Sequence, residues 1–83
     1  MSTKISLAEL SPGEKMMITS LQIDGTMRRR LLDLGFVPGF IVEMIQASPL
    51  GDPIAFRVSG TTIALRKEES SQIFGEKVMY DEQ

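Results

Sequence analysis

The chain has 83 residues, contains neither cysteine nor histidine, and has nine basic and eleven acidic side chains, for a net charge of −2. This length gives room for one domain with a thin core. Without cysteine there is no disulfide, thiol nucleophile or thiolate metal site, and without histidine the usual neutral-pH base and the commonest metal ligand are missing. The acidic balance also argues against nucleic-acid binding, because counterion release needs a basic surface.

Two sequence properties predict where the protein works. No uncharged stretch approaches the roughly 20 apolar residues that cross a bilayer, and the segment Met1–Ile5 has no signal-peptide core. We therefore expect a cytoplasmic protein without direct membrane insertion. We also expect a single domain over residues 1–83, with its core over about 7–76 and a frayed end over 79–83.

A turn and a strand are expected early in the chain. Ser11–Glu14 is a turn signal, and Lys15–Leu21 is rich in methionine and β-branched residues, which favours a strand. The residues Asp24, Gly25 and Thr26 then interrupt the strand pattern and offer two helix caps.

The segment Thr26–Leu34 carries the clearest helical pattern. Met27, Leu31 and Leu34 recur at i, i+4 and i+7, which places them on one helical face. Gly35 stands where a left-handed residue commonly ends a helix, so the pattern predicts a helix that ends there.

Five further elements follow, each next to a turn signal such as the tight hairpin turn Ser59-Gly60. They are three strands and one helical turn with a last strand after it: Phe40–Ala47, Ile54–Val58, Thr62–Leu65, the helical or 3₁₀ turn Lys67–Ser70, and Ile73–Val78. Period-two alternation predicts that five of their side chains point inward: Ile54, Phe56, Val58, Ile63 and Leu65.

These elements together predict a mostly β fold. Five short strands, one short α-helix after the first strand and a short helical turn before the last strand form a small barrel. Full closure of such a barrel removes the exposed sheet edges that invite aggregation. An open α+β sandwich is the alternative.

Three consecutive arginines on the predicted helix form the densest charge cluster, and helical geometry separates them. Arg30 borders the apolar stripe, so we expect its stem to pack while its guanidinium reaches water or a carbonyl. Arg29 precedes Asp33 by one turn and can pair with it. Arg28 has no such partner and lies beside Leu32, an apolar side chain off the main stripe. An apolar knob among arginines is typical of a small binding hot spot, and a solvated helix face is the plainer interpretation.

The sequence contains no recognisable catalytic or cofactor motif. The carboxylates are scattered, without an EF-hand loop or a paired-acid pattern. The glycines match neither a P-loop nor a dinucleotide fingerprint, and no Ser-His-Asp triad can form without histidine. We therefore expect no enzyme activity, no cofactor and no resident metal. The few aromatic residues also make a polyproline-binding groove a poor interpretation.

Four segments, in this order and spacing, closely resemble the FeoA family of ferrous iron transport. They cover about residues 7–76. They are the turn Ser11–Glu14, the R-L-x-x-L-G-φ-x-P-G segment Arg30–Gly39, the P-x-G-D-P loop in Pro49–Ile54, and the φ-A-L-R run that opens Ile63–Glu69.

The resemblance implies an SH3-like barrel and a cytoplasmic partner, the membrane transporter FeoB with its GTP-binding domain. It adds three candidate contact residues in the proline-rich loop, Pro49, Leu50 and Asp52, to the helix candidates Arg28, Arg29 and Leu32. One mechanism it suggests is an arginine, with Arg28 as the candidate, supplied to the nucleotide site of the partner.

The resemblance also leaves two questions open. The family is commonly labelled as transition-metal binding, but this sequence lacks the histidine and cysteine ligands that such a site would use. Similar domains form the C-terminal part of iron-dependent repressors, so a regulatory module acting on a DNA-binding protein is the alternative function. The oligomeric state is not specified by the sequence.

Overall fold

The computed structural model describes residues 4–78. Its elements in chain order are β1 (Lys4–Ser6), the 3₁₀ turn η1 (Leu7–Glu9), β2 (Lys15–Leu21), α1 (Gly25–Leu34), β3 (Ile41–Ala47), β4 (Ile54–Val58), β5 (Thr61–Leu65), α2 (Lys67–Ser70) and β6 (Ile73–Lys77). The expected frayed end lies outside the described residues.

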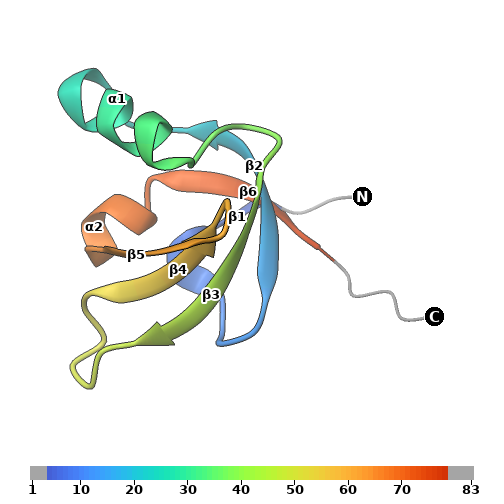
Figure 1. Cartoon of the computed structure of the whole chain (residues 1–83), viewed down its shortest axis with the longest axis vertical. Coiled ribbons are helices and arrows are strands. Elements are labelled where there is room, and N and C mark those ends of the chain that lie inside the picture. The colour runs from blue at the N-terminus through green and yellow to red at the C-terminus, as the bar shows by residue number, and fades with distance from the viewer. Residues whose placement is uncertain (1–3, 79–83) are drawn as a thin grey trace.

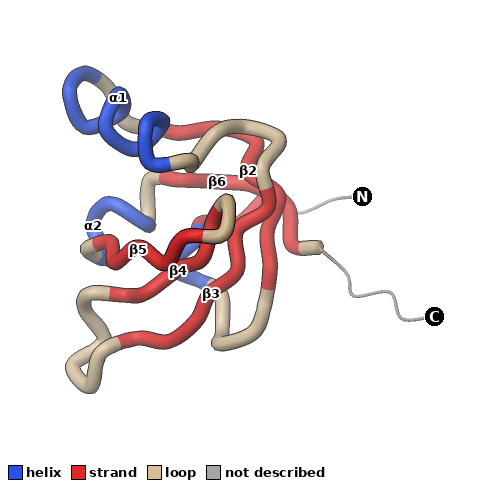
Figure 2. Tube along the Cα trace, in the orientation of Figure 1, coloured by secondary structure: helices blue, strands red, loops and turns tan. Residues whose placement is uncertain are grey.

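The strands form one antiparallel sheet in the order β1-β6-β2-β3-β4-β5. The sheet curls strongly, so β2 and β3 cross over the other strands to make a small barrel (Figures 1 and 2). Helix α1 stands outside the barrel, above α2 in this view. The predicted barrel is therefore confirmed, with one additional strand.

The additional strand and the sheet edges differ from the sequence-based expectation. β1 has only three residues, which is too short for a periodic pattern to reveal. The predicted full closure is wrong, because β1 and β5 end the sheet order and do not pair with each other within residues 4–78. The barrel thus retains two edges.

The core fills from alternating strand positions and the inner face of α1. Its fully or nearly fully buried apolar side chains are Leu7, Leu10, Met16, Ile18, Leu21, Leu31, Phe36, Val42, Met44, Ile54, Phe56, Val58, Leu65 and Ile73. Four of the five side chains expected to point inward are among them. The fifth, Ile63 on the edge strand β5, packs against the core but is only half-buried.

The ends of α1 explain how the helix is placed. Asp24 occupies the N-cap position with extended backbone, but its side chain makes no capping hydrogen bond. At the other end Gly35 is left-handed, with φ of 112°, as its position predicts. A Cβ on Gly35 would lie 3.3 Å from the Ser59 hydroxyl, so the end of α1 lies close to the β4–β5 turn.

Candidate partner-binding surface

Arg28 on α1 is anchored to the strand that precedes the helix. Its Nη1 donates a hydrogen bond to the carbonyl oxygen of Leu21, 3.2 Å away, and the side chain is half-buried. Helical spacing indicated no acidic partner for Arg28, and none pairs with it within residues 4–78, but a backbone carbonyl holds its side chain. The last carbonyl of β2 accepts this bond, and periodicity within the helix cannot reveal that contact.

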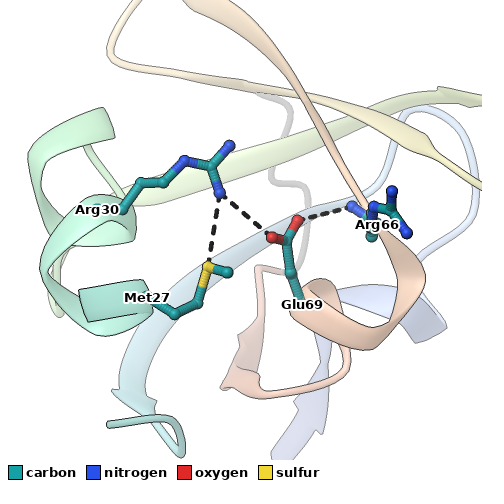
Figure 3. Close-up of polar contacts among 4 residues, drawn as sticks. All are labelled: Met27, Arg30, Arg66 and Glu69. Atoms are coloured by element: carbon teal, nitrogen blue, oxygen red, sulfur yellow. Dashed lines mark hydrogen bonds and ion pairs between the residues drawn. The ribbon is translucent and has the colours of Figure 1, made fainter. Parts of the chain in front are cut away.

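Arg30 joins α1 to α2. Its Nη1 lies 3.2 Å from Oε2 of Glu69 and 3.5 Å from the sulfur of Met27 (Figure 3). The other oxygen of Glu69, Oε1, accepts the backbone N–H of Arg66 at 2.9 Å. The Arg30 guanidinium was expected to reach water or a carbonyl. It remains half-exposed to water, as expected, and it also pairs with a carboxylate that helical spacing did not predict. Glu69 is only 7% exposed, so both of its oxygens are held within the fold.

Among the three arginines of α1, Arg29 is the one that no hydrogen bond or ion pair within residues 4–78 ties to another element. Its side chain is exposed, and no ion pair within residues 4–78 joins it to Asp33. The predicted pairing is wrong, because an exposed pair one turn apart gains little in water and loses side-chain freedom. Arg29 lines a shallow open depression together with Gly25 and Thr26 at the start of α1.

Leu32 is not an exposed knob. It is half-buried and packs against the core together with Met27 and Leu34. The buried face of α1 is therefore wider than the stripe that the predicted spacing defined, and it extends from Leu34 through Leu31 to Leu32.

The proline-rich loop between β3 and β4 presents an apolar tip. Leu50 is 93% exposed, and Pro49 beside it is also exposed. Asp52 has a structural role, because its Oδ1 accepts the backbone N–H of Lys67 at 2.9 Å. Asp52, Pro53 and Arg66 line a second shallow depression.

The structure does not bring the two groups of candidate residues together. Helix α1 lies at one end of the molecule and the β3–β4 loop at the opposite end (Figure 2), along the longest of extents of 40 × 29 × 24 Å. A partner would therefore contact either the Arg29 end or the Leu50 end, or would span the molecule.

Sequence reasoning missed an apolar patch on the outer face of the sheet. Met17 on β2 and Ile41 on β3 are cross-strand partners, 37% and 44% exposed, and Phe40 beside them is 44% exposed. Ile41 and Val42 could have indicated this patch, because adjacent side chains in a strand point to opposite faces and one of the two must therefore face outward.

One carboxylate has a clearly perturbed titration. Glu14 accepts a hydrogen bond from Nζ of Lys77 at 2.6 Å and another from the N–H of Ser11 at 2.8 Å. The bond to Lys77, followed by the bond to Ser11, lowers the pKa of Glu14 below its ordinary value. Glu14 thus ties the turn before β2 to the end of β6.

The described residues offer no ready site for a metal. Within residues 4–78, no three or more carboxylate, imidazole or thiolate side chains are gathered where they could hold an ion. Over the same range, no helix has the length and apolarity to span a bilayer.

A curled six-stranded antiparallel sheet with one helix after its first long strand defines the class of SH3-like barrels. Within that class the chain belongs to the FeoA domain family, whose model matches residues 5–77. The predicted family and fold are confirmed.

A relative of similar sequence supports this assignment to the FeoA domain family. The chain is 34% identical over 67 residues to the Fe(2+) transport protein A/Fe(2+) transporter FeoB fusion protein of Porphyromonas gingivalis. That match covers 81% of this chain and only 8% of the fusion protein.

Two solved structures are similar in sequence and fold. The FeoA-like protein of Clostridium acetobutylicum is 30% identical with a TM-score of 0.86, covering 100% of this chain and 96% of that one. The zinc-complexed FeoA of Stenotrophomonas maltophilia, a prokaryotic SH3-domain protein, is 33% identical with a TM-score of 0.73, covering 83% and 86%. A manganese-dependent transcriptional repressor shares the fold alone, at 13% identity.

Proposed function

We propose that the chain is a cytoplasmic accessory protein of ferrous iron uptake that binds and regulates a FeoB-like transporter. The observation that carries this proposal is the Porphyromonas gingivalis relative, in which a segment similar to this chain is fused to FeoB. A fusion keeps two parts at a high effective concentration, which suits parts that work on each other. The Stenotrophomonas maltophilia protein is itself described as a candidate activating factor of ferrous iron transport.

The geometry favours Arg29 as the arginine that contacts the partner. Arg28 and Arg30 already bond to groups of the fold, whereas Arg29 is exposed beside a shallow depression. An arginine supplied to the nucleotide site of a GTP-binding partner stabilises the charge that develops during hydrolysis. Arg28, the candidate from sequence alone, would first have to leave the carbonyl of Leu21.

Affinity capture from a detergent-solubilised membrane fraction tests the proposal. The tagged chain should retain a FeoB-like transporter, and the charge reversal Arg29→Glu should weaken that retention and lower the GTP turnover of the transporter. Lys4→Glu, which reverses an exposed basic side chain on β1, is the matched control. Unchanged retention and turnover for Arg29→Glu would show that Arg29 does not contact the transporter. A captured fraction that contains no transporter would contradict the proposed function.

The alternative is a regulatory module that acts on a DNA-binding protein. Its support is the fold shared with the manganese-dependent repressor, which matches 94% of this chain and 38% of that protein. Capture from the soluble fraction discriminates, because this alternative predicts a repressor there and no transporter in the membrane fraction.

A further inference from the structure

The free edge of the sheet at β5 has the features of a strand-docking site. β5 pairs with β4 on one side and ends the sheet order on the other. The hairpin turn before it fixes which backbone groups face outward. Ser59 and Gly60 have φ of 53° and 76°, as in a type I′ turn, so Val58 and Thr61 form the hydrogen-bonded pair that closes the hairpin.

Alternation along the strand then turns the backbone N–H and C=O groups of Thr62 and Ala64 away from β4. Beyond that strand pairing, none of the hydrogen bonds within residues 4–78 involves either residue. These groups are free to bond to an added strand.

β5 also lacks the features that protect edge strands. Natural edges carry lysine, proline or bulges that block pairing, and Thr61–Leu65 has none of these and no charge. The opposite edge, β1, is only three residues long, includes Lys4, and has the N–H of Ser6 bonded to Oε2 of Glu9 at 2.9 Å. The open edge is therefore specific to β5.

The side chains along this edge indicate what would bind there. Ile63 faces the core but is only half-buried, so an added apolar side chain beside it would cover it. On the outer face, Arg57 stands opposite Thr62, and Arg66 continues the strand beyond Ala64. Both arginines are exposed, and no ion pair within residues 4–78 includes either of them.

The carboxylates near these arginines do not neutralise them. Glu43, the cross-strand partner of Arg57, forms no ion pair with it within the described chain. Asp52 lines the depression beside Arg66 but accepts the N–H of Lys67. The Arg66 guanidinium points away from Glu69 (Figure 3). The edge thus carries positive charge near both ends.

We propose that the β5 edge binds an extended acidic segment of another protein as an added strand. Thr62, which lies opposite Arg57, and Arg66 are four residues apart, about 13 Å along a strand. A fitting segment carries carboxylates at i and i+4 on its outer face and apolar residues at i+1 and i+3 beside Ile63. A second copy of this chain fits poorly, because antiparallel pairing centred on Ile63 brings Arg66 of each copy toward Arg57 of the other.

An NMR titration with two synthetic peptides tests this inference, which is independent of the transporter proposal. The probe GEVTVEG should shift the amide resonances of Thr62 and Ala64, whose protons would then donate to the peptide. Its lysine counterpart, GKVTVKG, should bind about fivefold more weakly, as expected for two exposed charge pairs that become repulsive.

The surface double reversal of Arg57 and Arg66 to glutamate should invert this preference without disturbing the core, and Arg29→Glu on α1 should leave it unchanged. Ala64→Pro should abolish the shift of the Thr62 amide, because it removes an outward N–H that the β4 pairing does not use. Unmoved Thr62 and Ala64 amides at about 5 mM peptide, or shifts confined to α1, would overturn the proposal. Equal affinity for the two peptides would contradict the inferred preference for an acidic segment. A diffusion coefficient that falls as the protein concentration rises would show that the edge pairs with a second copy of the chain instead.

Discussion

Arg30 on α1 and Glu69 on α2 form an ion pair of 3.2 Å across 39 residues of sequence. The two partners differ in environment, since the Arg30 side chain is 51% exposed and the Glu69 side chain 9%. Water therefore screens the charge of Arg30, while Glu69 depends on its two bonds to remain satisfied in the core. Helix α1 is thus fixed by a partner on an element that follows it much later in the chain.

This asymmetry predicts unequal effects of truncating the two residues. Glu69→Ala removes the ion pair and the acceptor of the Arg66 N–H, so we expect a loss of about 1–2 kcal/mol in the free energy of unfolding. Arg30→Ala should cost less, about 0.5–1 kcal/mol, because its guanidinium is half in water. Urea denaturation of both single variants and the double variant measures the coupling. Equal losses for the two single variants would contradict this account.

A second prediction concerns Gly75, where β6 crosses close to β2. A Cβ on this residue would overlap the carbonyl oxygen of Met17 and lie 2.8 Å from its carbonyl carbon. Backbone cannot yield as a side-chain tip can, so Gly75→Ala should cost about 3 kcal/mol or more, or prevent folding.

Its control is Glu76→Ala, one residue further along the same strand on the outer face, which should change stability by less than about 0.5 kcal/mol. Thermal unfolding followed by circular dichroism compares the two variants with the parent chain. A Gly75→Ala protein as stable as the Glu76→Ala protein would show that the two strands can separate.

Features that depend on neighbouring residues could be predicted from the sequence, whereas contacts between residues far apart in the chain could not. Elements such as β2, β4 and α1 were predictable because their periodic patterns and turn residues are local. The partner of Arg30 was not, because it lies 39 residues away and meets the helix only after the sheet has curled. The half-buried position of Leu32 likewise depends on how α1 lies on the barrel. Candidate contact residues could be proposed from the sequence, but whether their side chains are exposed or already bonded within the fold could not be predicted.

A third prediction follows from the lowered pKa of Glu14. The folded chain holds this carboxylate in its charged form, so the unfolded chain binds the proton more readily. The stabilisation is therefore present above the ordinary carboxyl pKa of 4.5 and is lost as the pH falls through the lower folded value. Glu14→Gln should flatten the pH dependence of stability below about pH 4.5.

Lys77→Gln should give the same flattening, because the bond from Lys77 is the main cause of the lowered pKa. About 1 M salt should also reduce the effect, since both side chains are partly exposed. Denaturant unfolding at several pH values measures the slope. A slope unchanged in both variants would show that the Glu14–Lys77 bond does not persist in solution.

The fourth prediction separates folding from binding with two leucines. Leu32 packs half-buried against the core, and Leu50 is 93% exposed at the tip of the β3–β4 loop. Leu32→Ala should therefore lower the free energy of unfolding by about 1–2 kcal/mol, roughly half the cost of a fully buried leucine. Leu50→Ala should leave stability within about 0.5 kcal/mol of the parent chain.

Affinity capture of the two variants then distinguishes a structural residue from a contact residue. If the loop contacts the transporter, Leu50→Ala weakens its retention while the fold is unchanged, and Leu32→Ala weakens it only to the extent that the chain unfolds. Retention that is unaffected in Leu50→Ala and reduced in a fully folded Leu32→Ala protein would exclude the loop and leave the Arg29 end of the molecule as the contact. It would also make Leu32 a direct contact, reached through its exposed half beside Arg28 and Arg29.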